Sequence, residues 1–371
     1  MIRIDRTMLL AQVRRQLRVF DLPLLGALTL LVALSLFTMY SAASDYDGRM
    51  LDHVRNLAIA FMLMWAAANL PLNWMMRSAV PIYLLGLALL IAVAIFGDIA
   101  KGARRWLDLG FTRIQPSELM KIARPLMLAW YFHKRANAAR WYDFAIAAVL
   151  LLVPVLLIAR QPDLGTSLLV ASAGICVIYL AGLPWKVIAA SIVAGIGALP
   201  LLWTVMHDYQ RQRVMMLLDP TSDPLGKGFH IIQSEIAVGS GGLWGKGWLD
   251  GTQAHLEFVP ERTTDFVFAV YAEEFGLVGN GVLLLAYLLV IGRGLMIAAH
   301  GATVFARLLA GAITLIVFTY AFVNMGMVTG ILPVVGVPLP MMSYGGTAML
   351  TLGVGFGLLM SIARQRKLVQ T

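Results

Sequence analysis

The chain has 371 residues, of which 60% are hydrophobic and only 13% are charged, and its mean hydropathy is +0.79. Soluble proteins carry about 25% charged residues, so this composition indicates a polytopic membrane protein and argues against two or three soluble domains. The single cysteine, Cys176, excludes an internal disulfide and a metal site built from cysteines.

Nine apolar segments are long enough to cross a bilayer, which takes about 20 helical residues. They are residues 22–42, 56–76, 80–99, 143–159, 167–183, 187–206, 266–291, 304–329 and 346–362. A tenth segment, residues 116–132, is short and carries Glu118, Lys121 and Arg124. Hydropathy alone therefore leaves it open between a span and a re-entrant segment.

The distribution of positive charge favours the tenth span. When it is counted, 15 Lys and Arg residues and three Asp residues fall on one face, and such an excess is typical of the cytoplasmic face. We therefore expect an all-α polytopic integral membrane protein with about ten transmembrane helices and both termini cytoplasmic. The first apolar run exceeds the core of a signal peptide, so we interpret it as an uncleaved span.

No linker separates soluble domains, so the sequence predicts one transmembrane domain over residues 1–371. Residues 1–21 form a cytoplasmic head, residues 207–264 one large extracytoplasmic loop, and residues 363–371 a cytoplasmic tail.

The formal net charge of +9 follows mainly from this topology and from anionic lipid at the inner surface, so it does not indicate nucleic-acid binding. One positive patch lies on the opposite, outer face, where the positive-inside rule does not predict an excess of Lys and Arg. It is the short outer segment 101–113, in which four basic residues accompany one acid, Asp108; the basic residues are Lys101, Arg104, Arg105 and Arg113.

The charged residues of segment 116–132 are spaced by three, which places Glu118, Lys121 and Arg124 along one ridge of a helix. Ionisable groups inside a bilayer are costly and usually mark function. An ion pair that only fixes helix packing remains an equal alternative for Glu118 and Lys121. Arg124, nearer the inner end, is expected to extend towards the lipid headgroups.

Three loop segments carry further candidates. Asp163 either caps the next helix or points into the polar interior. The glycine-rich segment 239–247 lacks the spacing of a nucleotide-binding loop, so we expect a flexible loop at the membrane edge. No histidine pair has the spacing of a zinc protease, so the sequence predicts no zinc site.

The large outer loop, together with Asp265 at its edge, holds eight of the chain's 20 carboxylates. Asp265 is the last of them, directly before the apolar run that begins at Phe266. From its position alone, an aspartate capping that helix is the more common role, and a catalytic carboxylate is the alternative.

Four groups of residues together resemble the SEDS family, the shape, elongation, division and sporulation proteins. They are residues 104–106 with 114–121, residues 161–167, residues 247–266 and residues 332–347. The resemblance covers nearly the whole chain and is greatest to the elongation type of the family. Thr263 and Thr347 depart from the usual pattern, which has His and Ser at these positions.

This resemblance implies a peptidoglycan glycosyltransferase that polymerises lipid II at the outer face of the bacterial cytoplasmic (inner) membrane during elongation. It implies that Asp265 is the catalytic general base and that Glu118 and Lys121 line a cavity open to lipid. It also implies two kinds of protein partner, a class B penicillin-binding protein and the proteins of the rod-shape complex.

The chemistry of lipid II suggests roles for the other candidates. The attacking sugar hydroxyl must lose a proton, which Asp265 can accept, and the leaving pyrophosphate gains negative charge. Lys101, Arg104, Arg105 and Lys121 suit that charge, and we expect Glu118 and Asp163 to belong to the same substrate-binding region. A divalent cation, Mg or Mn, is left open, since no dedicated metal site is evident.

Two alternatives remain at this stage. A lipid II flippase or transporter would also need ionisable residues along a lipid path, and a non-enzymatic scaffold of the elongation complex would need only a docking loop.

Overall fold

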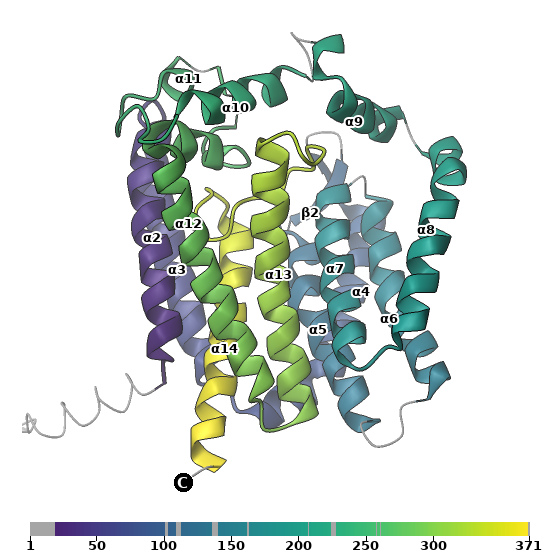
Figure 1. The fold of residues 1–371 in the computed structure, drawn as a ribbon. Helices are drawn as coiled ribbons and strands as arrows, with labels where there is room; N and C mark the ends of the chain where they lie inside the picture. Colours follow the sequence, from purple (N-terminus) through teal and green to yellow (C-terminus); the bar gives the residue numbers. More distant parts are fainter. Residues whose placement is uncertain are drawn as a thin grey trace, which may run out of the picture.

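The computed structural model in Figure 1 describes residues 19–100, 103–108, 113–135, 140–161, 163–206, 208–223, 228–256, 258–259 and 261–369. Lys101 and the head arginines lie outside these ranges, and so does the side chain of Arg104.

Within the described residues, ten helices of 17 to 33 residues stand side by side (Figure 1). They are α2 (Leu22–Ala42), α3 (Arg49–Ala68), α4 (Leu72–Phe96), α5 (Pro116–Lys134), α6 (Trp141–Ala159), α7 (Leu164–Leu180), α8 (Trp185–Val205), α12 (Val267–Ala299), α13 (Val304–Val328) and α14 (Gly346–Val369). By length and composition, six of them are long and apolar enough to cross a membrane: α2, α4, α6, α12, α13 and α14. Each of the ten predicted spans overlaps a different one of these helices, including the short charged one, which is α5. The predicted bounds 56–76 are wrong, however, because α3 already ends at Ala68 and Leu72 begins α4.

The ends of the chain agree with the predicted orientation. Arg293, near the end of α12, donates two hydrogen bonds to the Asp21 carboxylate, which caps the start of α2, at 2.8 and 2.7 Å. Figure 1 shows that α14 also ends at this side of the bundle. This is the side to which the charge pattern assigns the cytoplasm.

Close helix packing depends on small residues and on the repair of proline breaks. A Cβ on Gly353 of α14 would lie 2.5 Å from the Ala60 carbonyl oxygen of α3, so only glycine allows this approach. In α6, Pro154 cannot donate to the Leu150 carbonyl one turn before it. The Tyr83 hydroxyl of α4 donates to that carbonyl instead, at 2.9 Å, and so keeps a buried acceptor satisfied.

Arg124 does not extend to the headgroups, so that prediction is wrong. Its side chain is fully buried in α5, and all three guanidinium nitrogens lack a hydrogen-bond partner among the described residues. The helix continues ten residues beyond it to Lys134, about 15 Å, which is too far for a side chain to reach.

The outer end of the bundle is more structured than a polar loop. Segment 207–264 contains α9 (Asp208–Leu218), a 3₁₀ turn η1 (Pro220–Ser222), α10 (Phe229–Ser240) and α11 (Thr252–His255). These elements lie across the top of the bundle in Figure 1. The predicted loop 101–113 is also ordered in part, as a small antiparallel sheet of β1 (Asp98–Ala100), β2 (Ala103–Asp108) and β3 (Arg113–Ile114). The fold is therefore all-α apart from this sheet.

The glycine-rich segment 239–247 is not a flexible loop, contrary to the prediction. Its backbone pairs with α12 through Lys246 N to Glu273 O at 3.0 Å and Gly247 N to Glu274 O at 3.1 Å. The pairing is geometrically allowed because α12 is interrupted at Gly276, whose φ is 62° and ψ −159°. Only glycine adopts that conformation readily. Gly276 therefore allows α12 to form backbone hydrogen bonds with segment 239–247.

Candidate functional site

Asp265 lies at the outer end of the bundle, directly before α12. The N-cap position of α12 is occupied by Phe266, so Asp265 precedes it by one residue. The segment around it is anchored to α2 by Arg262, which is 2% exposed. Its guanidinium donates to the Ala42 carbonyl at 3.0 Å and to the Asp45 carboxylate at 2.6 Å.

Thr263 fixes the same segment from the other side. The Arg49 guanidinium donates to its hydroxyl at 2.7 Å, and the backbone N–H of Tyr344 donates to its carbonyl, also at 2.7 Å. Asp265 therefore follows two consecutive residues that are anchored to α2, α3 and the segment before α14.

The carboxylate of Asp265 lies against the connection between α13 and α14, residues 329–345. A Cβ added to Gly336, where φ is 71°, would be 3.3 Å from Asp265 Oδ2. Asn324 of α13 joins the two segments, since its amide donates to the Asp265 carbonyl at 2.8 Å and to the Val337 carbonyl at 2.7 Å. Asn324 is fully buried.

The predicted intramembrane ion pair is present. Lys121 Nζ lies 2.5 Å from Glu118 Oε1, and it also donates a hydrogen bond to the Tyr320 hydroxyl of α13. Tyr320 precedes Asn324 by four residues, so the two lie about 6 Å apart along one face of α13. The ion pair and the Asp265 segment are thus attached to consecutive turns of one helix.

Asp163 fulfils both roles that the sequence left open. Its Oδ1 caps α7 by accepting from Thr166 N at 3.1 Å. Its Oδ2 accepts from Gln115 Nε2 at 3.3 Å and lies 3.8 Å from Arg105 Nε. At this same helix start, a Cβ on Gly165 would overlap the Val335 carbonyl oxygen, so α7 packs directly on the 329–345 connection.

Two of the groups that carry the family resemblance contact the connection 329–345, which contains most of a third: Asp265 lies against Gly336, and Gly165 packs on Val335. The remaining group is attached to α13, through the hydrogen bond from Lys121 to Tyr320. Of the predicted positive patch, the side chains of Arg105 and Arg113 are described, and Arg113 Nε donates to the Asp108 carboxylate at 3.2 Å. The roles of Lys101 and Arg104 stay predictions.

His230 of α10 covers the start of α12. Its ring stacks on Phe266, with 6.0 Å between centroids and 19° between planes. Burial lowers the pKa of His230 below its ordinary value, while the nearby Glu261 carboxylate acts in the opposite direction. This shift favours the neutral form of the ring beside the Asp265 segment.

The sequence prediction missed three residues of this region: Asn324, Tyr320 and Arg49. Asn324 and Tyr320 left a signal, because an amide and a phenol four residues apart in an apolar span form a polar stripe. Arg49 left none, since its partner Thr263 is 214 residues away.

In the part of the chain that the structure describes, no group of three or more His, Cys, Asp and Glu side chains is placed to hold a metal ion. We therefore assign no residue to a divalent cation.

Comparisons with known proteins agree with the motifs. The family model described as "Cell cycle protein", FtsW/RodA/SpoVE, matches residues 15–368. The peptidoglycan glycosyltransferase MrdB of Escherichia coli K12 is 52% identical over 350 residues, 94% of this chain and 95% of that protein.

Two solved structures share the fold. One, described as "Structural coordination of polymerization and crosslinking by a peptidoglycan synthase complex", has a TM-score of 0.82 and 35% identity, over 94% of this chain and 98% of that chain. The rod shape determining protein RodA of Thermus thermophilus has a TM-score of 0.72 and 30% identity, over 94% and 97%. The chain belongs to the FtsW/RodA/SpoVE family, which is the SEDS family that its motifs indicated.

Proposed function

We propose that this chain is a peptidoglycan glycosyltransferase of the elongation type that polymerises lipid II at the outer face of the membrane. The name of its E. coli relative supports the reaction class. The observation that carries the proposal is the placement of Asp265, whose carboxylate lies beside Gly336 at the outer end of the bundle. Its backbone is held in place by Asn324.

In this mechanism Asp265 acts as the general base. A sugar hydroxyl of the acceptor attacks the anomeric carbon of the donor, and the carboxylate accepts the hydroxyl proton as the new glycosidic bond forms. The bond from the anomeric carbon to the pyrophosphate oxygen breaks, and polyprenyl pyrophosphate leaves. One displacement converts an α-linked donor into a β-linked polymer, so it requires one base and no covalent sugar–enzyme intermediate.

The leaving pyrophosphate needs cations. Arg105 is partly exposed and is oriented by Asp163. Lys101 and Arg104 precede Arg105 in the sequence, and we propose that these three residues bind the pyrophosphate. Glu118 forms an ion pair with the buried Lys121 at the level of Tyr320. We propose that the positive charge of Lys121 adds to the electrostatic stabilisation of the leaving pyrophosphate from within the membrane.

The polymer must also be cross-linked. The solved relative described above belongs to a complex that coordinates polymerization and crosslinking. We propose that this chain likewise works with a class B penicillin-binding protein within the rod-shape complex.

The decisive test is polymerisation of purified lipid II by Asp265→Asn. We expect the rate of glycan-strand synthesis, measured by gel electrophoresis of the products, to fall about 10²–10⁴-fold. This is the usual contribution of a general base. Glu261→Gln, which removes a neighbouring carboxylate of the same segment, should polymerise normally. Both variants should keep the Tm of the wild type. Normal strands from folded Asp265→Asn would refute the assignment.

The buried ion pair also suits a lipid flippase, and reconstitution separates the two activities. A flippase moves labelled lipid II between leaflets without lengthening it, whereas the proposed enzyme lengthens it in detergent, where no leaflets exist. A scaffold would let Asp265→Asn support growth.

A further inference from the structure

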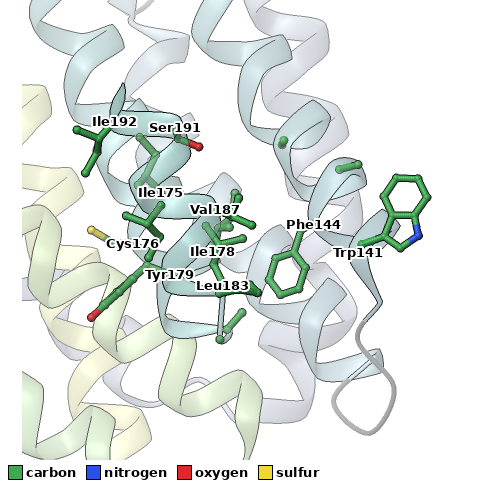
Figure 2. Close-up of a pocket in the computed structure, with 16 residues that line it drawn as sticks. Trp141, Phe144, Ile175, Cys176, Ile178, Tyr179, Leu183, Val187, Ser191 and Ile192 are labelled. Carbon is green, nitrogen blue, oxygen red and sulfur yellow. The ribbon is translucent and has the colours of Figure 1, made fainter. Parts of the chain in front are cut away.

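A large apolar cleft lies between α8 and the pair α6 and α7, on the side of the bundle away from Asp265. Its volume is about 1050 Å³. Figure 2 shows that its walls are formed by side chains such as Phe144 of α6, Ile175 and Tyr179 of α7, and Val187 and Ile192 of α8. None of the residues placed in the catalytic region lines it.

The cleft spans about half the depth of one lipid leaflet. Along α8 it extends from Val187 to Ile192, and along α7 from Ile175 to the end of the helix at Leu180 and into the turn after it. At 1.5 Å per helical residue each helical stretch corresponds to about 8 Å, against about 15 Å for half of the hydrocarbon core. The cleft starts at the ends of α6, α7 and α8 that the charge pattern assigns to the cytoplasm. It therefore lies within the inner leaflet and does not reach the outer face.

The dimensions and lining restrict the occupant. Apolar walls disfavour water, and a partner helix that crosses the membrane would need a groove of about 30 Å. A hydrocarbon chain of an inner-leaflet lipid fits both the length and the chemistry. It would also cover α8, for which no described side chain is buried against the rest of the protein.

The rim of the cleft selects the headgroup. Trp141 and Trp185 are 82% and 73% exposed there, as expected for aromatic residues at the membrane–water interface. Arg140 precedes Trp141 on the α6 wall, and Lys186 follows Trp185 on the α8 wall; both are exposed. The acid at this rim, Asp143, is buried and accepts hydrogen bonds from Tyr131 Oη and Arg140 N. The two cations thus lie on opposite walls with no carboxylate exposed between them among the described residues.

We propose that an anionic phospholipid of the cytoplasmic leaflet binds in this cleft, with an acyl chain between α7 and α8 and its phosphate between Arg140 and Lys186. The lipid is a structural ligand, distinct from the substrate, which acts at the other face. It supplies the apolar contacts that α8 lacks from protein.

The test is native mass spectrometry and thermal unfolding of the full chain in detergent with added phosphatidylglycerol, phosphatidylethanolamine or phosphatidylcholine. We expect phosphatidylglycerol to be retained preferentially and to raise the Tm. Each cation near an anionic headgroup strengthens binding about fivefold, so Arg140→Gln with Lys186→Gln should weaken retention about 25-fold. Arg307→Gln, which removes an exposed cation at the start of α13, should retain the lipid.

A second pair of variants tests the location. Ala145→Trp fills the cleft from α6 and should abolish retention, whereas Ile146→Trp, at an exposed neighbour outside the lining, should not. Equal retention of the three lipids, or undiminished retention by the double charge variant or by Ala145→Trp, would overturn the proposal. Because lipid retention is measured without substrate, failure here leaves the role of Asp265 untouched.

Discussion

Among the carboxylates of the outer region, contacts separate structural ones from the candidate base. Glu273 lies 2.6 Å from Lys246 Nζ, and Asp45 lies 2.6 Å from Arg262. Both therefore serve to hold the outer loop on the bundle. Asp265 lies on the segment that Arg262 anchors: its backbone carbonyl accepts from Asn324, and its carboxylate lies beside Gly336.

Asn324 is the residue that sets this geometry. Each of its two hydrogen bonds to backbone carbonyls contributes about 0.5–1.5 kcal/mol to stability. Its own Oδ1 is buried without a partner among the described residues, which costs about 1–3 kcal/mol. The two contributions to the free energy of folding roughly cancel. We therefore infer that the Asn324 amide serves mainly to position Asp265 relative to Val337.

Asn324→Leu tests this interpretation. We expect kcat for lipid II polymerisation to fall at least tenfold with little change in KM, because a displacement of about 1 Å at a reacting group can cost 10²-fold. Thr314→Val is the matched control: it removes a buried hydrogen bond of α13, from Thr314 to Ala310, far from Asp265. A KM effect without a kcat effect, or equal losses in both variants, would contradict a positioning role.

At the scale of elements, α12 and segment 239–247 depend on each other. The helix leaves its regular path at Gly276, and the freed backbone bonds with the segment, as in Leu277 N to Gly242 O at 2.9 Å. Neither the interruption nor the pairing is visible in hydropathy, which predicts one continuous apolar span here.

Gly276→Ala should destabilise the protein markedly. Its backbone conformation is nearly restricted to glycine, at a cost of about 1–3 kcal/mol for other residues, and the added Cβ would also overlap Gly245 N. Gly281→Ala lies on the same helix with nothing within 4 Å of the added atom, and should be neutral or stabilising by up to about 1 kcal/mol. Thermal unfolding in detergent checks both, and an unchanged Tm for Gly276→Ala would contradict the described backbone.

At the scale of the molecule, hydropathy and charge predicted the ten helices and the placement of the start of α2 and the end of α14 at one end of the bundle (Figure 1). Hydropathy predicts the helices because the thickness of the bilayer sets their length, and charge predicts their direction because of the positive-inside rule. Both signals can be read from short stretches of sequence. The assembly of the catalytic region could not be predicted from these patterns. It depends on contacts such as Arg49 to Thr263 and Asn324 to Asp265, which join residues 214 and 59 positions apart. Family resemblance identified Asp265, but it did not identify the residues that hold it.

The Glu118–Lys121 pair joins α5 to α13 through Tyr320, and its role can be tested on the whole bundle. Breaking a buried pair leaves one uncompensated charge, so Glu118→Gln or Lys121→Met alone should each cost about 3–5 kcal/mol. Replacing both at once removes both charges and should restore the Tm to nearly the wild-type value, since apolar replacements of buried pairs are often neutral.

We expect the double variant to be stable but to polymerise lipid II poorly, because the cation that we propose to act on the leaving pyrophosphate is gone. Tm and strand synthesis should be measured on the same preparations, so that lost activity cannot be confused with lost fold. Activity that returns together with stability would show that the pair only packs helices. Persistent inactivity in a stable protein would show that its charge acts on the substrate.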